Sequence, residues 1–384
     1  MPATPALIAA WARSAVAPVG GAFRSLHAHE IGAPVVRALL QRAGLSPEAV
    51  DAVVLGNALG AGGNPARMLA LAAGLPDRCA ALSVDTQCCS GLDAIALAVG
   101  LLASGQASVV IAGGVEAWSR APLRHTRPLH AGDAPVAYER PAFAPDPARD
   151  PDLLASAADY AAQHGITRAQ QDAYAVHSHQ RALQAQAWLS DEIVVINGLQ
   201  HDAYPRALTL ERAARMPLAV QREGAAECAV STLAISTKAD GAALVLLCTP
   251  AACQRLGLTP RAAWLASASV GADPCTPLLA AQAAAQVALQ RAGIDNAADL
   301  QAIELHDAFA VQGLSFCQAL GLDPAAINRH GGGLARGHPI GASGAIALVR
   351  LLADLQHDTA PAARGLAAVA GAGGIGAAAM VERV

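Results

Sequence analysis

A faint internal repeat constrains the fold of this 384-residue chain more than any other feature. Each copy reads as a helix end followed by a short strand and a polar pair, then a helix that begins after Ser-Gly, then a strand of small residues. The matched pairs, in the same order along the chain, are residues 47–59 with 297–309, 90–102 with 343–352, and 109–115 with 367–374. Alanine- and leucine-rich helices resemble one another through composition, but three matches in order favour a duplication. We therefore expect two similar α/β halves.

The stretch between the two copies has a different amino-acid composition. Residues 119–227 are richer in Pro, His, Arg and Asp, and the sequence predicts a helix over 167–182. Thr167 followed by Gln170 forms a capping-box pattern at its start. Aromatic residues such as Trp188 need burial, which favours a packed insertion over a flexible linker. The predicted organisation is an N-terminal half at 1–118 and 228–249, an inserted loop-and-helix domain covering a binding cleft at 119–227, and a C-terminal half at 250–384.

Composition excludes several classes of protein. The net charge of -4 leaves no basic footprint for nucleic acid. Apolar runs such as residues 94–103 are too short and too interrupted by glycine to cross a bilayer. The N-terminus lacks a basic region followed by an apolar core, so we expect no signal peptide. We therefore expect a cytoplasmic protein with neither a nucleic-acid nor a membrane partner.

The eight cysteines show no C-x-x-C pair and no regular framework, which fits free thiols in a reducing cytosol better than disulfides. The histidines lack the spacing of metal ligands, so we expect no metal site. The chain also carries neither a dinucleotide-binding fingerprint nor a phosphate-binding loop with its GK[ST] ending.

Cys88 is the strongest candidate for chemistry. It follows a short β-like stretch and opens an alanine-rich helix, where the partial positive charge of the helix N-terminus would stabilise a thiolate. Ser90 and Gly91 permit a tight strand-to-helix turn whose backbone N–H groups could hold an oxyanion. A lone cysteine is more often an inert buried residue. Cys89 is the rival nucleophile, although its side chain would point in another direction.

Two histidines are candidate partners of this thiol. His338 lies in the stretch GHPIGASGA at 337–345, where Pro339 fixes the backbone that follows it. It is either a structural turn histidine or, taken with Cys88, the general base that accepts the thiol proton. His306 follows a predicted strand at the place where the first copy has Gly56, and a site role and a satisfied core histidine are equally compatible with this. A cysteine paired with a histidine suggests covalent acyl transfer.

An ordered set of motifs resembles the thiolases over essentially the whole chain. The motifs are QCCSGLDA at 87–94, GGVEAWS at 113–119, HDAFAVQ at 306–312 and NRHGGGLARGHPIGASGA at 328–345, with shorter matches at 64–67 and 270–274. The resemblance implies an α/β fold of two βαβαβαββ halves in a layered α-β-α-β-α arrangement, with a loop domain that embraces coenzyme A. It also implies a homodimer or homotetramer.

The resemblance further implies a ping-pong acyltransferase that uses acyl-CoA and coenzyme A as substrates and keeps no cofactor permanently bound. The cysteine matching Cys88 attacks an acyl thioester after activation by the histidine matching His338. A second acyl-CoA is then condensed or, in reverse, a 3-ketoacyl-CoA is cleaved. His306 replaces the more usual Asn and would help to bind a thioester oxygen through water. Ser236 matches the serine beside the pantetheine arm.

One departure from the family pattern bears on the reaction. Most thiolases carry a second cysteine near the C-terminus as acid/base at the substrate α-carbon, and Ala370 stands at that position here. Another branch keeps this cysteine after the His-Asp pair, where this chain has Ala308. Ala372 falls where a glycine N–H usually completes an oxyanion hole. Cys317 and Cys275 are poor substitutes, because one lies in an apolar helical stretch and the other in a turn.

Three hypotheses follow. In the first, carbon–carbon cleavage or condensation continues with an unrecognised acid/base. In the second, Cys88 is acylated and passes the acyl group to water or to a non-carbon acceptor. In the third, the chain is an acyl-CoA-binding non-catalytic subunit or one that needs a small accessory protein. Retention of both Cys88 and His338 argues against a purely non-catalytic module, and a general acid/base is worth about 10²–10⁴-fold in rate.

Overall fold

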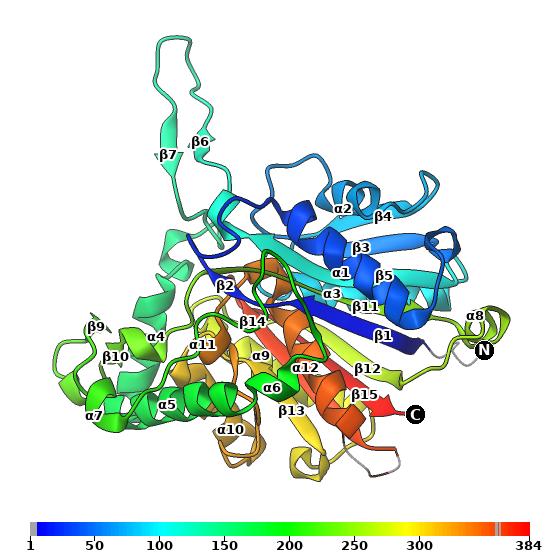
Figure 1. Ribbon diagram of the computed structural model, residues 1–384. Helices are drawn as coiled ribbons and strands as arrows, with labels where there is room; N and C mark the ends of the chain where they lie inside the picture. The colour runs from blue at the N-terminus through cyan, green and yellow to red at the C-terminus, as the bar shows by residue number, and fades with distance from the viewer. Residues whose placement is uncertain (1–5, 358–359, 361) are drawn as a thin grey trace.

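The computed structural model describes residues 6–357, 360 and 362–384, and it contains the two expected halves (Figure 1). The N-terminal half has strands β1 (Leu7–Ser14), β3 (Ala52–Gly56), β4 (Ala80–Val84), β5 (Val109–Ala117) and β11 (Ala239–Cys248), with helices α1 (Ala28–Ala43), α2 (Pro65–Ala73) and α3 (Ser90–Ala103). The C-terminal half has strands β12 (Ala262–Gly271), β13 (Ala302–His306), β14 (Arg364–Gly371) and β15 (Ile375–Arg383), with helices α9 (Ala280–Arg291), α10 (Ala310–Leu320) and α12 (Ser343–His357).

The strands form one continuous mixed sheet in the order β13-β14-β15-β12-β1-β11-β5-β3-β4. The halves join where β1 pairs with β12, at Leu7 opposite Ala263 and Ile8 opposite Ala262. Within each half the inner strands run parallel, β3 with β4 and β5, and β13 with β14. Strands β3, β5 and β13 are buried along their whole length, as parallel strands covered on both faces usually are.

The helices form three layers around the two halves of the sheet. Helices α1 and α2 cover the outer face of the N-terminal half, and α9 covers the outer face of the C-terminal half with α10 beside it. Helices α3 and α12 contact each other and contact strands of both halves, so they form the middle layer. This arrangement confirms the layered α-β-α-β-α expectation, and the three repeat matches coincide with β3 and β13, α3 and α12, and β5 and β14.

The two halves differ at one point. The N-terminal half follows the expected βαβαβαββ order, but the described residues 321–342 between α10 and α12 contain no strand. Asn328 occupies part of this path, donating its backbone N–H to the carbonyl of Ile303 and accepting from the N–H of Leu305 through its side chain. A loop residue therefore satisfies the free edge of β13, in place of a third parallel strand.

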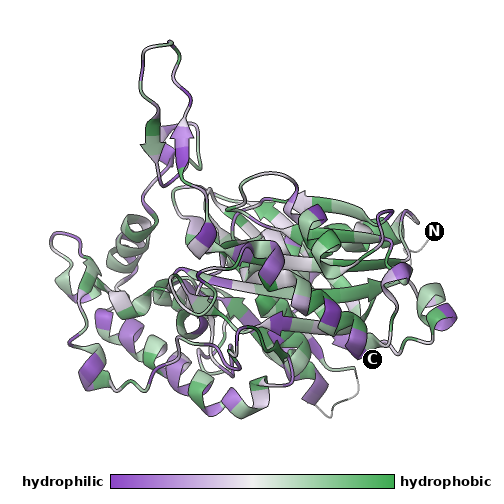
Figure 2. Ribbon diagram, turned by 45° about the horizontal axis from the view of Figure 1, so that its top comes forward, coloured by the Kyte–Doolittle hydropathy of each residue, from purple (hydrophilic) through white to green (hydrophobic). Residues whose placement is uncertain are grey.

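The insertion between β5 and β11 folds as a packed unit with a projecting hairpin (Figures 1 and 2). Its helices are α4 (Leu153–His164), α5 (Arg168–Gln184), α6 (Gln186–Leu189) and α7 (Leu210–Ala213), and its strand pairs are β6 (Arg124–Thr126) with β7 (Val136–Tyr138) and β9 (Leu218–Val220) with β10 (Val230–Ser231). Thr167 caps α5 in a capping box with Gln170, which confirms the predicted helix start. The exact domain boundaries stay a prediction.

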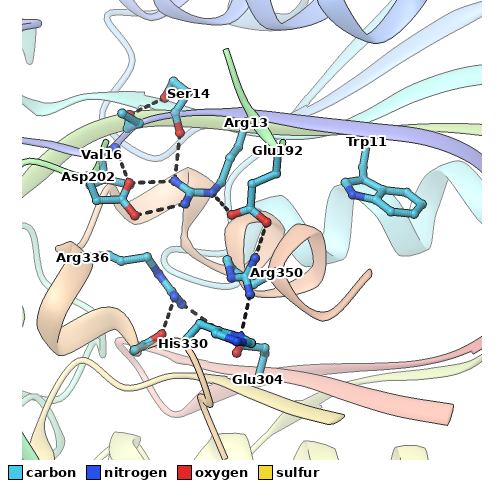
Figure 3. Close-up of polar contacts among 12 residues, drawn as sticks. Trp11, Arg13, Ser14, Val16, Glu192, Asp202, Glu304, His330, Arg336 and Arg350 are labelled. Carbon is cyan, nitrogen blue, oxygen red and sulfur yellow. Dashed lines mark hydrogen bonds and ion pairs between the residues drawn. The ribbon is translucent and has the colours of Figure 1, made fainter. Parts of the chain in front are cut away.

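A buried network of ion pairs ties the insertion to both halves (Figure 3). Arg13 on β1 donates to Glu192 of the insertion at 2.5 Å and to both oxygens of Asp202 at 2.7 and 3.0 Å. Arg350 on α12 donates to the other oxygen of Glu192 and to Asp354. Burial opposes the charged form of Arg13, but Asp202 and Glu192 outweigh it and raise its pKa. Each arginine is held in the core by these carboxylates.

We predict that Glu192→Ala destabilises the fold strongly, because it removes the carboxylate shared by Arg13 and Arg350 and leaves two buried cations under-compensated. The expected loss is about 3–5 kcal/mol in the free energy of unfolding, measured by denaturant titration. Glu382→Ala is the matched control, since its pair with Arg364 is partly exposed, and it should cost less than about 1 kcal/mol. Equal losses in the two variants would show that the network does not carry this stability.

Candidate active site

The turns that carry Cys88 and His338 meet in the middle layer through backbone contact. A Cβ atom on Gly91 would lie 2.7 Å from the carbonyl oxygen of Gly341, and one on Gly114 would overlap that same oxygen. Any side chain at these glycines would push the start of α3, the strand β5 and the turn before α12 apart. The glycines of the three motifs are therefore needed for the close approach that brings the cysteine and the histidine together.

Hydrogen bonds hold Cys88 in a tight turn between β4 and α3. Ser90 Oγ accepts from the N–H of Thr86 at 2.9 Å and donates to the carbonyl of Gln87 at 2.5 Å. Gln87 has a φ of 55°, a left-handed conformation that is rare for residues other than glycine, asparagine and aspartate. The turn sets the half-buried Cys88 at the N-terminal end of α3, as the sequence predicted.

Cys88 Sγ lies 3.1 Å from His338 Nε2, so the structure brings the predicted nucleophile and base into contact. Burial raises the pKa of Cys88 to about 12, while the backbone N–H groups of Ala372 and Cys88 lower it. Desolvation of the sulfur outweighs these N–H groups, so burial opposes the thiolate expected at the helix N-terminus, and that expectation stays a prediction. The resting group is a thiol, which needs a base at the moment of attack.

His338 is neutral and oriented by two side chains. Burial lowers its pKa to about 4, so its ring can accept a proton across the neutral pH range. Its Nδ1 lies 3.1 Å from Ser343 Oγ and also contacts His306 Nε2. If Cys88 donates its proton to Nε2, Nδ1 carries the ring proton and donates to one of these partners, an assignment inferred from the hydrogen-bond network.

His306 lies behind His338 as seen from Cys88. The two imidazole rings meet edge to edge through His306 Nε2 and His338 Nδ1, with their centroids 4.5 Å apart and their planes at 24°, and His306 is 4% exposed. Burial, followed by the neighbouring His338 and Arg336, lowers its pKa well below the usual value. Of the two readings open from the sequence, the geometry favours a site role, because His306 contacts the base directly. Its contact is with the ring nitrogen opposite the one that faces the thiol.

The backbone N–H groups of Cys88 and Ala372 both lie near the sulfur and lower the pKa of its thiol. Ala372 belongs to the turn between β14 and β15, where Gly373 and Gly374 have φ values of 80° and 77°. Two converging N–H donors from a helix start and a hairpin turn are suited to an oxyanion that forms beside Sγ. The resemblance to the thiolases placed Ala372 where a glycine N–H usually completes an oxyanion hole, and this role stays a prediction.

Ser236 contacts the turn that precedes the base. Its hydroxyl donates to the carbonyl of Gly333 at 2.6 Å, and its backbone N–H donates to the carbonyl of Ala308 at 2.8 Å. The half-buried Ser236 therefore links the segment that follows His306 to the glycine run before His338. Its predicted contact with the pantetheine arm stays a prediction.

The three other thiols considered from the sequence occupy different environments. Cys89 is buried and its Sγ donates to the carbonyls of Val369 and Ile375 at 3.6 and 3.7 Å, so it points to the β14–β15 hairpin. Cys317 is buried in the cluster between α10 and α9, where burial raises its pKa to about 12. Cys275 lies in the loop after β12, and its carbonyl accepts from Ser156.

Ala370, at the position of the family's second cysteine, is half-buried and lies in β14 opposite Gly376.

Glu116 is a residue of the site region to which the sequence assigned no role. It lies in the motif GGVEAWS, it is 1% exposed, and its carboxylate bonds to the turn that follows His338. The signal available in the sequence was an acidic residue at the end of a run of small, apolar residues, where a charge must be satisfied by the fold. Which groups satisfy it depends on contacts between distant segments.

Comparison with known proteins decides the family. The model of the thiolase N-terminal domain matches residues 6–251, and that of the thiolase C-terminal domain matches residues 258–383. The chain belongs to the thiolase family. As a thiolase-family member it is an acyltransferase enzyme, and the resemblance drawn from its motifs is confirmed. Within the described residues, no cluster of three or more potential metal ligands occurs, and no helix has the length and apolarity to cross a membrane.

Relatives match this thiolase along nearly their whole length. It is 38% identical to the acetyl-CoA acetyltransferase of Allochromatium vinosum over 395 residues, with 97% of each chain covered, and 37% identical to that of Shinella zoogloeoides over 397 residues, with 99% of each covered. Its fold matches the acetyl-CoA acetyltransferase of Bacillus anthracis with a TM-score of 0.90 at 30% identity, covering 100% of this chain and 99% of that one. Human mitochondrial 3-ketoacyl-CoA thiolase in complex with CoA also matches with a TM-score of 0.90, at 26% identity and 99% and 98% coverage.

We predict that Cys88 of the free enzyme alkylates slowly at neutral pH. Because burial raises its pKa to about 12, the thiolate fraction should rise about tenfold with each pH unit between 7 and 10. Iodoacetamide labelling followed by mass spectrometry of the Cys88 peptide measures this rate, and the Cys89→Ser variant assigns the label. A rate that levels off near pH 7 would show that the helix N-terminus stabilises the thiolate after all.

Proposed function

We propose that this thiolase-family enzyme transfers acyl groups from acyl-CoA through a thioester on Cys88, with His338 as the base. The observation that carries the proposal is the 3.1 Å contact between Cys88 Sγ and His338 Nε2, beside the backbone N–H groups of Cys88 and Ala372 that lower the pKa of the thiol. The relatives named acetyl-CoA acetyltransferase support acyl-CoA as the substrate. Coenzyme A enters and leaves as a substrate, and no permanently bound cofactor is needed for this step.

The first half-reaction follows from these positions. The Cys88 thiol gives its proton to His338 Nε2 as the sulfur attacks the thioester carbon. The N–H groups of Cys88 and Ala372 hold the oxyanion of the tetrahedral intermediate. The intermediate collapses by breaking the bond to the coenzyme A sulfur, which takes the proton back from His338. The products are free coenzyme A and an acyl group on Cys88.

His306 and Ser236 have supporting roles in this proposal. His306 Nε2 accepts the Nδ1 proton of His338 and thereby keeps Nε2 free to act as the base. The resemblance also gives His306 a second role, binding a thioester oxygen through water. Ser236 is proposed to lie beside the pantetheine arm, and residues 119–227 are proposed to cover coenzyme A.

A second candidate function rests on Ala370. A methyl group cannot exchange a proton with the substrate α-carbon, and Ala308 leaves the other family position for this thiol equally inert. Acylation of Cys88 needs no such group. The replacement therefore favours transfer of the acyl group to water or to a non-carbon acceptor over condensation and thiolysis. An acyl-CoA-binding subunit that needs a small accessory protein is the remaining alternative.

We predict an acyl adduct on Cys88 after incubation with acetyl-CoA or longer acyl-CoAs, detected by mass spectrometry of the intact protein and its peptides. Cys88→Ser should abolish the adduct and Cys89→Ser should preserve it. Cleavage of a 3-ketoacyl-CoA is measured in parallel in the native enzyme and in Ala370→Cys. A rise of about 10²–10⁴-fold in this variant identifies the missing acid/base.

Each result of these assays distinguishes between the functions. The absence of any adduct would overturn the acyltransferase proposal and favour a binding subunit. If the native enzyme forms the adduct and also cleaves the 3-ketoacyl-CoA as fast as Ala370→Cys does, the second candidate is overturned. Cleavage by the native enzyme would then require another acid/base. An adduct without thiolysis supports transfer to water or to a non-carbon acceptor.

We also propose that the protein is a cytoplasmic homo-oligomer. All eight cysteines are free, which fits a reducing compartment. Within the described residues, strand β4 forms the outer edge of the sheet and pairs only with β3. Leu82 on this edge is 45% exposed, and its neighbours Met68, Leu71 and Leu97 are exposed to similar extents. An unprotected edge strand flanked by exposed apolar side chains favours pairing with a second copy.

We predict that light scattering after gel filtration gives at least twice the chain mass of 38.6 kDa. Leu82→Lys should shift the protein toward the monomer, because it places a charge on the proposed interface. Val195→Lys is the control, since Val195 is also exposed but lies in the insertion. A monomer at tens of micromolar native protein would contradict the proposal.

A further inference from the structure

Glu116 presents a buried carboxylate whose charge is satisfied entirely by N–H groups. Its Oε1 accepts from Asn57 Nδ2 at 2.8 Å and from the N–H of Leu59 at 3.3 Å, and its Oε2 accepts from the N–H groups of Ala58 and Gly341 at 3.0 and 2.9 Å. No ion pair includes it among the described residues. Burying a carboxylate without a cation is costly in free energy unless such donors converge on it. The four N–H donors therefore form a specific binding site for the Glu116 carboxylate.

The four donors belong to two chain segments that meet at Glu116. Residues 57–59 follow β3, and Gly341 lies in the turn between His338 and α12. Gly341 is three residues after the base and two before Ser343, whose hydroxyl contacts His338 Nδ1. Glu116 therefore accepts a hydrogen bond from the turn that follows the base, and this bond links the turn to the N-terminal half.

The other side of the same turn is also fixed. The carbonyl oxygen of Gly341 lies in the space that side chains on Gly91 and Gly114 would fill. Gly91 is three residues after Cys88, at the start of α3. The turn after His338 is thus held by steric contact with the cysteine-bearing helix on one side and by the Glu116 carboxylate on the other.

The charge of Glu116 does not activate the nucleophile. Burial raises the pKa of Glu116 to about 7, against the opposing effect of the N–H groups of Ala58, Gly341 and Leu59. When ionised, the carboxylate raises the pKa of Cys88, which disfavours the thiolate. The charge of Glu116 therefore opposes ionisation of the thiol, while its hydrogen bond to the N–H of Gly341 acts on the geometry of the turn after His338.

We infer that Glu116 is a positioning residue, which holds the Gly341 turn so that His338 Nε2 is aimed at Cys88 Sγ. The inference rests on the proposed acylation of Cys88. Proton transfer between the two groups requires their present 3.1 Å contact, and a displacement of about 1 Å can cost on the order of 10²-fold in rate. Glu116 touches neither the sulfur nor the imidazole and acts through the backbone between them.

The test compares Glu116→Gln with the native enzyme in single-turnover acylation by acetyl-CoA. Gln keeps the shape of the side chain, but it replaces one carboxylate oxygen with an NH₂ group. This group faces N–H donors and cannot accept hydrogen bonds from them. The acylation rate at saturating acetyl-CoA should fall about 10- to 100-fold, while the half-saturating concentration changes less than about twofold. Asp51→Asn is the matched control, because Asp51 accepts from the N–H groups of Ser108 and Val109 at the opposite end of β5. It should change the rate less than about twofold.

A double-mutant cycle separates positioning from general support of the fold. In a His338→Ala background, Glu116→Gln should have an effect of less than about twofold, because the residue it positions is gone. The same loss in both backgrounds, or a native rate in Glu116→Gln, would overturn the inference. Asn57→Ala, which removes only one of the four donors, should give a smaller loss that also disappears with His338, and it replaces Glu116→Gln if that variant does not fold.

A crystal structure of the Glu116→Gln enzyme tests the inference independently of activity. The distance from Cys88 Sγ to His338 Nε2 should exceed about 4 Å in the variant, beyond hydrogen-bond reach. An unchanged distance would overturn the positioning role even if acylation is slow. Failure of the native enzyme to form an adduct would overturn the proposed function and leave this structural result to decide the role of Glu116.

Discussion

The close crossing of α3 and α12 in the middle layer is the constraint on which the rest of the structure depends. These helices begin at equivalent points of the two halves, and each starts at a Ser-Gly pair. Because Gly91, Gly114 and Gly341 carry no side chains, the two helix starts approach through their backbones. The duplication therefore does more than double the core. It brings a thiol from one copy and an imidazole from the other into contact.

The electrostatics of this junction follow from its burial. Desolvation raises the pKa of Cys88 and lowers those of His338 and His306, so the site rests in a neutral state. A neutral thiol next to a neutral imidazole avoids the cost of keeping an ion pair in a poorly hydrated place. Charge then appears only during the reaction, beside N–H donors that are already in position. The buried cations, by contrast, lie with their carboxylates in the network of Arg13, Glu192 and Arg350.

Much of the fold could be predicted from the sequence because it is encoded locally. The repeat predicted the paired elements, and Thr167 with Gln170 predicted the start of α5. Features that depend on distant partners could not be predicted in this way. The side chain of Asn328 satisfies the edge of β13 where the resemblance to the thiolases implied a strand, and the raised pKa of Cys88 depends on how much protein surrounds the sulfur. The contacts of Glu116 join segments that no local pattern relates.

The register of β5 and β11 has a consequence for how such a protein can change. The chain leaves β5 at Ala117 and enters β11 beside Asp240, and these two residues are partners in the same antiparallel ladder. Between them the insertion adds to the sheet only the two-residue strand β8 (Ile193–Val194), which pairs with β1. A segment whose two ends meet at one rung can be lengthened, shortened or replaced while the ladder stays intact, since loop-closure entropy grows only slowly with length. The junction of Cys88 and His338 lies in the duplicated core. The insertion and this junction are thus parts of the chain that can diversify separately, and the Glu192 ion pairs mark where a replacement of the insertion must still fit.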